Sequence, residues 1–424
     1  MILIKDGRVI DPRSGIDETL DIMIEKDRIT GIGKFQKSEG CTRVIDAKGM
    51  IVAPGLVDVH VHFRDPGFTH KEDVESGAKA AAAGGYTTVI CMANTRPVVD
   101  NVEVLKDLRE RSKNLPVKVL NVAAVTTGMN GQQLTDMDAL KQNGAVGFSD
   151  DGIPIQDAGI LMKAMEKAKE LNAPISLHEE DPQLMGSCGI NQGVVSEAVG
   201  TAGAPAVAEE VLVARDGLLA LKTGARVNFQ HVSSRVSVDL IALLKKLGAD
   251  IYAEVTPQHF SLTENEVLEK GTLAKVNPPL RTEEDRYGLI KGIKDDVIDI
   301  IATDHAPHSQ EEKDAIIDLA PSGMIGLETA LALGITNLVR KGHITMPQLL
   351  KKMTVNPAKL YRMDCGYLEV GKSADIVIFD EREKWTVETF HSKSSNSPFI
   401  GAELYGKVNY TICNGQIVYE KERG

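Results

Sequence analysis

Two histidines with one residue between them, His60 and His62, lie in an apolar run near the start of the chain. In an extended strand, successive side chains alternate between two faces. The valines of residues 57–61 therefore fall on one face, whereas Asp58, His60 and His62 fall on the other. Two imidazoles at this spacing are about 6.5–7 Å apart along the backbone and can converge on one metal ion. A pair of core histidines that only form hydrogen bonds is the alternative interpretation.

The rest of the chain supplies further side chains that bind metals. Each lies at the end of a short apolar run: Asp151, His178, His231 and Asp304. Imidazole and carboxylate ligands suit zinc, with manganese, cobalt or iron as alternatives. Six ligands are too many for one catalytic zinc ion, which usually takes about three protein ligands. They fit two ions about 3.5–4 Å apart, so the sequence predicts one or two Zn²⁺ per subunit, with two favoured.

The run at residues 145–151 is expected to supply a carboxylate that bridges the two metals. Alternation directs Asp151 inward and Asp150 toward the surrounding helices. We therefore favour Asp151 as the bridge and expect Asp150 to cap a turn, although the sequence leaves this choice open. The same alternation is less favourable for His231, so a bulge or the strand end must turn this side chain toward the metals.

This ligand set predicts metal-assisted hydrolysis of an amide-like bond. A bound metal lowers the pKa of water to about 7, so a metal-bridged hydroxide is the expected nucleophile. Asp304 is the candidate general acid/base, because it can take a proton from the nucleophile and pass it to the leaving nitrogen.

These side chains require a scaffold that brings distant strand ends together. Apolar runs of strand length alternate with helical patterns, such as those at residues 71–83, 206–221 and 236–247. Eight such units predict a parallel sheet, and right-handed crossovers favour a closed (β/α)₈ TIM barrel at residues 54–364. An open doubly wound sheet is the alternative, but no GxGxxG follows the first strand. The predicted strands are residues 56–63, 86–92, 117–125, 145–151, 174–178, 226–231, 250–255 and 298–304.

The two ends of the chain have the pattern of short strands. Asp6-Gly7 and Asn414-Gly415 are hairpin turn signals within residues 2–10 and 408–418. Each end alone is too small for a good core, so residues 1–53 and 365–424 are predicted to pair into one small β-sandwich. The expected fold class is α/β, with the barrel inserted between the two halves of this sandwich.

The composition limits the classes of partner and compartment. The chain has 424 residues and a net charge of −12, which argues against nucleic acid or an anionic membrane as a partner. A small anionic substrate stays compatible, because it needs only a few local cations. Five cysteines without a CxxC motif argue against a disulfide framework, and the apolar runs are too short for a membrane span. The start has no signal-peptide pattern, so a cytoplasmic location is expected.

The ligand pattern resembles the amidohydrolase superfamily, in which a barrel carries HxH on strand 1, histidines on strands 5 and 6, and an aspartate on strand 8. Within it, three stretches resemble the dihydroorotase family: residues 58–67 (DVHVHFRDPG), 275–281 (KVNPPLR) and 302–313 (ATDHAPHSQEEK). Residues 92–97 (MANTRP) are a weaker fourth match. The resemblance covers nearly the whole chain, and the third motif is the most specific.

The resemblance implies a zinc-dependent cyclic amidohydrolase that interconverts (S)-dihydroorotate and N-carbamoyl-L-aspartate in pyrimidine biosynthesis. An arginine offers a planar fork for a carboxylate, and an asparagine offers a donor and an acceptor for a ring amide. Many relatives bridge their metals with a carbamylated lysine on strand 4, but residues 145–151 contain no lysine. The chain thus resembles the class I type in which an aspartate takes that place. The substrate contacts that the resemblance implies are Arg64, Asn94, Asn277, His308, and the backbone of Ser322 and Gly323.

Two alternative functions stay open at this point. Allantoinase and hydantoinase-like enzymes share the metal site, but they usually lack an arginine at position 64 and the Asn-Pro-Pro-Leu-Arg run. The second alternative is a catalytically silent barrel that acts as a scaffold for a partner enzyme, although such relatives tend to lose ligands. A homodimer is the expected assembly, because two-fold dimers are the commonest oligomers. Some relatives associate with aspartate transcarbamoylase, and this remains a partner hypothesis without a sequence mark.

Overall fold

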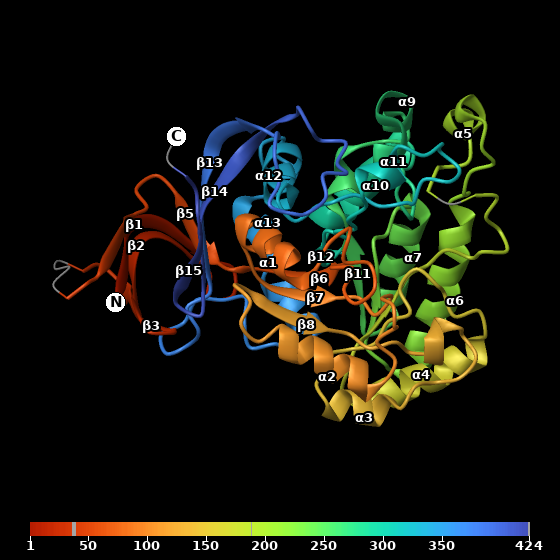
Figure 1. The fold of residues 1–424 in the computed structure, drawn as a ribbon, viewed down its shortest axis with the longest axis horizontal. Helices are drawn as coiled ribbons and strands as arrows, with labels where there is room; N and C mark the ends of the chain where they lie inside the picture. Colours follow the sequence, from red (N-terminus) through yellow and green to blue (C-terminus); the bar gives the residue numbers. More distant parts are fainter. Residues whose placement is uncertain (36–39, 188, 423–424) are drawn as a thin grey trace.

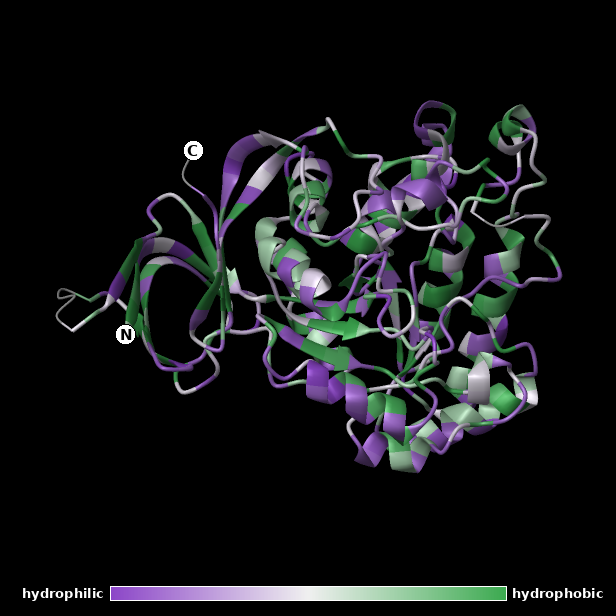
Figure 2. Cartoon of the chain, viewed as in Figure 1, coloured by the Kyte–Doolittle hydropathy of each residue, from purple (hydrophilic) through white to green (hydrophobic). Residues whose placement is uncertain are grey.

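The computed structural model describes residues 1–35, 40–187 and 189–422. Figure 1 shows a β-rich part, built by both chain ends, beside a larger part in which helices surround short strands. Hydrophobic residues are concentrated in the strands of both parts (Figure 2). Within these residue ranges, no helix is both long and apolar enough to cross a membrane. The four cysteines in the same ranges are free, and Cys188 lies outside the described residues.

One eight-stranded sheet joins the two ends of the chain. Its central pairing is the antiparallel contact of β5 with β13, in which Pro54 lies opposite Ile376. Buried side chains from both ends, among them Ile4, Ile22 and Ile376, form a hydrophobic core of its own. The two ends therefore share one β-rich unit, as the sequence predicts, whereas the domain boundaries at residues 53 and 365 stay predictions. The strand order is β15-β14-β13-β5-β1-β2-β3 with β4 beside β1, and the bounds are β1 (Ile2–Asp11), β2 (Ile16–Glu25), β3 (Arg28–Gly33), β4 (Arg43–Asp46), β5 (Ile51–Pro54), β13 (Ile376–Thr386), β14 (Glu403–Cys413) and β15 (Gln416–Glu420).

The Asp6-Gly7 pair does not form the hairpin turn that the sequence predicts. Strand β1 continues through both residues, and its register against β2 shifts at this point. Asp6 has a φ of 56°, and a Cβ on Gly7 would lie 2.4 Å from Val52 Cγ2. These turn-type residues therefore form a bulge that lets β1 pass close to β5. The hairpin turn predicted at Asn414-Gly415 is confirmed between β14 and β15.

Parallel pairings close the central strands into a barrel. The sheets β6-β7-β8 and β9-β10-β11-β12 are each continuous. Phe148 forms parallel bridges with Ala123 and Ile175, and Val61 forms one with His305, so the two sheets join at both edges. The predicted (β/α)₈ barrel is confirmed, although its fourth strand is reduced to the bridge at Phe148. The regular strands are β6 (Leu56–Val61), β7 (Tyr86–Cys91), β8 (Lys118–Asn121), β9 (Ile175–Leu177), β10 (Val227–Phe229), β11 (Ile251–Val255) and β12 (Ile300–Ile301).

Helices cover the outside of this barrel (Figure 1). Helix α1 begins after Asp73, whose carboxylate accepts hydrogen bonds from the backbone amides of Glu75 and Ser76. The stretches predicted at residues 71–83, 206–221 and 236–247 correspond to α1, α6 and α7. The longer helices are α1 (Val74–Ala83), α2 (Val102–Arg111), α4 (Ala158–Glu170), α6 (Val207–Thr223), α7 (Arg235–Lys246), α10 (Glu283–Lys294) and α13 (Met346–Met353). The shorter ones are η1 (Thr127–Met129), α3 (Met137–Gln142), α5 (Val194–Val199), α8 (Pro257–Ser261), α9 (Glu266–Lys270), η2 (Gly271–Ala274), α11 (Gln310–Lys313), α12 (Ala330–Gly334), η3 (Ile335–Val339) and α14 (Val355–Leu360).

Candidate metal centre and substrate pocket

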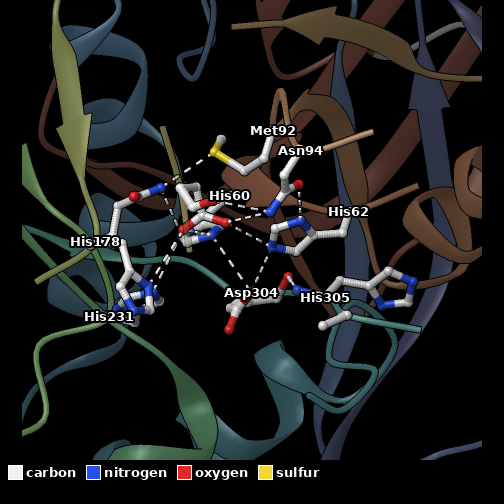
Figure 3. Close-up of polar contacts among 12 residues, drawn as sticks. His60, His62, Met92, Asn94, His178, His231, Asp304 and His305 are labelled. Atoms are coloured by element: carbon white, nitrogen blue, oxygen red, sulfur yellow. Dashed lines mark hydrogen bonds and ion pairs between the residues drawn. The ribbon is translucent and has the colours of Figure 1, made fainter. Parts of the chain in front are cut away.

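The candidate ligands meet at the carboxyl ends of the barrel strands (Figure 3). His60 belongs to β6 and His62 follows it, whereas His178 comes directly after β9. His231 has a φ of 34° and Asp304 a φ of 49°, and both residues lie just beyond their strands. A left-handed backbone changes the direction in which the side chain points. The end of β10 therefore turns His231 toward the other ligands, which regular alternation along the strand would not do.

Asp151 lies between two pairs of histidines. Its Oδ1 is 3.4 Å from His60 Nε2, and its Oδ2 is 3.4 Å from His62 Nε2. The same Oδ1 is 3.7 Å from His178 Nδ1 and 3.8 Å from His231 Nε2. Two groups that could each hold a metal ion therefore share this carboxylate.

Asp150 has a different environment from its neighbour. Its Oδ1 accepts hydrogen bonds from the backbone amides of Val125 at 2.7 Å and Thr126 at 3.2 Å. Its Oδ2 accepts a further bond from the Thr126 hydroxyl. The carboxylate of Asp150 thus caps the turn after β8, and the carboxylate of Asp151 is the one that faces the histidines.

Asp304 lies beside the first pair of histidines. Its Oδ1 is 2.9 Å from His62 Nε2 and 3.5 Å from His60 Nε2. Burial is the largest single influence on Asp304 and Asp151 and raises their pKa values, but the surrounding histidines, His60 foremost, together outweigh it and both pKa values are lowered. Burial would likewise lower the pKa of His60, but the two carboxylates raise it well above its ordinary value. The cluster therefore stabilises positive charge at its centre.

Two buried atoms at this centre test whether a metal fits. Neither His60 Nε2 nor Asp151 Oδ1 has a hydrogen-bond partner among the residues that the structure describes. Buried polar atoms are ordinarily paired, and a nitrogen lone pair facing a carboxylate oxygen cannot pair with it without a proton or a cation between them. The donor set of imidazole nitrogens and carboxylate oxygens is one that transition metals accept. The residues present therefore fit a bound metal ion.

A cavity of about 120 Å³ opens beside the cluster. Most of the predicted substrate contacts lie on its wall. Asn277 Oδ1 is buried and has no hydrogen-bond partner in the described part of the chain, so its acceptor is available to a ligand. The cavity is lined by His62, Arg64, Asn94, Asp151, Gly152, His178, His231, Asn277, Asp304, Ala306, Ser322 and Gly323.

Asn94 forms hydrogen bonds with two of the candidate ligands. Its Oδ1 lies 3.0 Å from His62 Nδ1, and its Nδ2 donates to Asp151 Oδ2 at 3.1 Å. An amide oxygen only accepts, so His62 Nδ1 carries the proton and its Nε2 lone pair faces the cluster. The structure thus assigns Asn94 an orienting contact in addition to its position on the pocket wall.

His308 does not line the cavity itself but contacts two residues that do, Arg64 and Ser322. Its Nε2 lies 2.9 Å from the Ser322 carbonyl oxygen and 3.3 Å from Arg64 Nη2. Burial lowers the pKa of His308 to about 2, and the neighbouring Arg64 and Lys71 act in the same direction. A neutral His308 can use Nε2 either to donate to the Ser322 carbonyl or to accept from Arg64, so it lies between the arginine and the loop that carries Ser322 and Gly323.

Sequence reasoning missed two residues that hold this site together. Glu254, on β11, lies 3.1 Å from His60 Nδ1 through its Oε2. An acidic residue inside the apolar run of residues 251–255 is the signal that could have indicated it. Asn396 accepts a hydrogen bond from the backbone of His308, in the loop after β12. It lies in a polar segment, so its residue type does not stand out in the sequence.

Two family models match the chain. Residues 49–237 match the model described as Dihydro-orotase-like. Residues 326–419 match the model described as Amidohydrolase family.

Curated relatives and solved structures extend over nearly the whole chain. The dihydroorotase of Clostridioides difficile (strain 630) is 61% identical over 419 residues, covering 99% of this chain and 100% of its own. That of Lactococcus lactis subsp. lactis is 54% identical, covering 99% of both chains. Among structures, L-hydantoinase (dihydropyrimidinase) from Arthrobacter aurescens superposes with a TM-score of 0.89 at 26% identity, covering 100% of this chain and 96% of its own. D-hydantoinase from Thermus sp. gives 0.86 at 25% identity, covering 100% and 97%.

Proposed function

The chain belongs to the dihydroorotase family of amidohydrolases, and from this premise we propose that it is a zinc-dependent dihydroorotase. It is a hydrolase that acts on cyclic amides. The proposed reaction is the reversible conversion of (S)-dihydroorotate and water to N-carbamoyl-L-aspartate, a step of pyrimidine biosynthesis. The observation that carries the proposal is the position of Asp151 between two histidine pairs, beside a pocket that Arg64 lines.

Two metal ions are the favoured occupancy. His60, His62 and Asp151 would hold one ion, and Asp151, His178 and His231 would hold the other. Zinc suits this mixture of imidazole and carboxylate ligands. When bound, the metal would lower the pKa of water and polarise the carbonyl of the cyclic amide.

Asp304 is proposed to hold and move the proton. Its carboxylate lies on the pocket wall, and its lowered pKa keeps it ionised at neutral pH. An ionised carboxylate can accept a proton from the attacking water and donate it to the ring nitrogen as the amide bond breaks. The carboxylate lies 2.9 Å from His62 Nε2, the atom with which His62 would hold the metal.

Arg64 is proposed to bind the carboxylate of the substrate. Its Nε donates to the Pro307 carbonyl oxygen at 3.2 Å, which fixes the plane of the guanidinium. Burial lowers the pKa of Arg64, so an anion in the pocket would offset the unfavourable burial of this cation. Asn277 would accept a hydrogen bond from the ring, because its Oδ1 is an acceptor on the pocket wall without a hydrogen-bond partner among the described residues.

A hydantoinase-like activity is the second candidate, and the likeness to solved hydantoinases favours it. The test is an assay of the zinc-loaded protein with dihydroorotate, N-carbamoyl-L-aspartate, hydantoin and allantoin in parallel. Turnover of the first two well above the others supports the proposal. Preference for hydantoin or allantoin contradicts it, and a protein that neither binds metal nor hydrolyses any of them is a scaffold.

We also propose that the enzyme acts in the cytoplasm as a homodimer, with small anions as its substrates rather than nucleic acid or membrane as partners. The free cysteines of the described ranges support a reducing compartment. Light scattering of the protein, alone and mixed with aspartate transcarbamoylase, measures both the assembly and the proposed association. A monomer that does not bind aspartate transcarbamoylase would exclude both the homodimer and the association.

A further inference from the structure

Glu254 is a carboxylate in the interior of the barrel, with none of its surface exposed. It belongs to neither of the two candidate ligand groups. Burying a charged group is unfavourable unless hydrogen bonds or opposite charges compensate for it. Its partners are His60, whose Nδ1 lies 3.1 Å from Oε2, and Asn228, whose Nδ2 donates to Oε1 at 2.5 Å.

The contact with Glu254 decides which nitrogen of His60 carries the proton. An ionised carboxylate only accepts hydrogen bonds, so His60 Nδ1 must be the donor. The amide nitrogen of Gln230 is 3.3 Å from the same Nδ1, but it also lies 3.3 Å from Met92 Sδ and can donate there. With the proton on Nδ1, the lone pair of His60 Nε2 faces Asp151 Oδ1, which is where a metal fits.

A chain of hydrogen bonds anchors Glu254 from behind. Asn228, on β10, donates through the same Nδ2 to Ser176 Oγ at 3.1 Å. Ser176, on β9, lies 2.9 Å from the hydroxyl of Tyr361, which directly follows α14. All members of this chain are buried, and they come from three adjacent strands and one helix end. The orientation of the carboxylate is therefore set by the barrel and not by one flexible loop.

We propose that Glu254 is the positioning residue that confers metal affinity on the His60, His62 and Asp151 group, by holding His60 with Nε2 toward the ion. The proposal rests on the proposed function, because it requires a bound metal. A hydrogen-bonded carboxylate behind a ligating histidine fixes the ring and makes it a stronger ligand. Asn228 in turn holds Glu254 in place, because its side-chain amide donates a hydrogen bond to the carboxylate.

Glu254→Gln tests this role with little change in volume. His60 and Asn228 both donate hydrogen bonds to the Glu254 carboxylate. A glutamine offers one acceptor oxygen where the carboxylate offers two. Either His60 or Asn228 then loses its partner, so we expect the zinc affinity of the metal-depleted protein to fall about 10–100-fold. The affinity is measured by competition with a chromogenic chelator, and the visible spectrum of the Co²⁺ form reports any change in ligands.

The exchange Glu254→Gln with Asn228→Asp is the matching rescue. The glutamine oxygen can accept from His60 while its nitrogen donates to the new carboxylate at 228, and the Ser176 hydroxyl can donate to that carboxylate in place of the bond it accepted from Asn228. We expect most of the zinc affinity to return. Glu72→Gln is the control: Glu72 is equally buried and lies 3.5 Å from His305, a histidine outside the ligand groups, so zinc affinity should not change.

The outcomes separate this inference from the proposed function. Unchanged zinc affinity in Glu254→Gln, with a metal-binding and active wild type, overturns the inference and leaves the function intact. A wild type that binds no zinc overturns both. If Glu254→Gln does not fold, ¹⁵N-histidine spectra of the zinc-loaded wild type decide, since a proton on His60 Nδ1 supports the inference and a proton on Nε2 overturns it.

Discussion

The side chain of Asn396 accepts a hydrogen bond from the backbone amide of His308 at 3.1 Å. Its Nδ2 donates to the carbonyl oxygens of Ala306 and Gly323, both at 3.1 Å. Asn396 lies in the connection between β13 and β14, whereas Ala306 and Gly323 line the pocket beside the histidine cluster of the barrel. One buried side chain from the C-terminal part of the chain therefore joins two walls of the pocket.

Asn396→Asp should weaken substrate binding. The carboxylate keeps the acceptor for His308 but removes the donor and places negative charge against two carbonyl oxygens. An unsatisfied buried group costs about 1–3 kcal/mol, so we expect KM for N-carbamoyl-L-aspartate to rise about 5–150-fold. Steady-state kinetics and zinc content are measured together. Asn143→Asp is the control, because it removes a hydrogen bond that the Asn143 side-chain amide donates to the Ala139 carbonyl oxygen at the end of α3. Equal effects in both variants would contradict a specific role of Asn396.

Asp304→Asn should abolish turnover while the fold persists. The amide preserves the shape of the side chain but cannot accept the proton from water. Loss of a general acid/base typically lowers the rate about 10²–10⁴-fold, and kcat should fall by at least that much. Circular dichroism and thermal unfolding check the fold. A kcat close to that of the wild type would rule out the proposed role of Asp304.

Arg64→Ala should mainly raise KM. Hydrogen bonds to charged groups contribute about 1.5–3 kcal/mol, which corresponds to an increase of roughly 10–150-fold in KM for the anionic substrate. Arg64→Lys keeps the charge but loses the planar fork, so its effect should be intermediate. If neither variant changes KM, the substrate carboxylate binds elsewhere.

Lys313 should make stability depend on pH above neutrality. It is buried, and its Nζ donates to the carbonyl oxygens of Pro321 at 2.9 Å and Gly323 at 3.1 Å. Burial, followed by the charge of Lys275, lowers the pKa of Lys313 from 10.5 to about 7. Between these two pH values the unfolded chain binds more protons than the folded chain, so this lysine makes the free energy of unfolding increase as pH rises.

The comparison of wild type with Lys313→Met isolates this contribution. From pH 7 toward pH 10.5, the wild type should gain stability relative to the variant by up to about 1.4 kcal/mol per pH unit. Urea unfolding at a series of pH values measures it. Lys169→Met removes an exposed lysine bonded to the Thr223 carbonyl oxygen and should show the same pH dependence as the wild type. Parallel curves for wild type and Lys313→Met would disprove the assignment.

Metal removal should inactivate and destabilise the protein together. Without a cation, the buried Asp151 and the lone pair of His60 Nε2 lose the partner that fits between them. A ligand at 100 times its Kd stabilises the folded state by about 2.7 kcal/mol, so chelation should lower Tm and added Zn²⁺ should restore it. Activity should return in the same titration. A chelated protein with full activity would exclude metal catalysis.

Local pattern was sufficient to predict most of the barrel. Alternation along β6 places His60 and His62 on one face, and helix periodicity marks α6 and α7, because both depend on residues a few positions apart. The bulge at Asp6-Gly7 was not predictable in this way. The same dipeptide suits a tight turn or a bulge, and the neighbouring strand β5 decides between them.

Residue types and their spacing were enough to identify the side chains that could bind a metal and to place them near strand ends. The partners of these side chains depend on the folded chain: Asp150 caps a turn while Asp151 faces four histidines, Glu254 orients His60, and Asn396 joins two pocket walls. The reason is that alternation is a property of the backbone and acts locally. A hydrogen bond between residues about 90 to 190 positions apart exists only after barrel closure and pairing of the chain ends have brought those residues together.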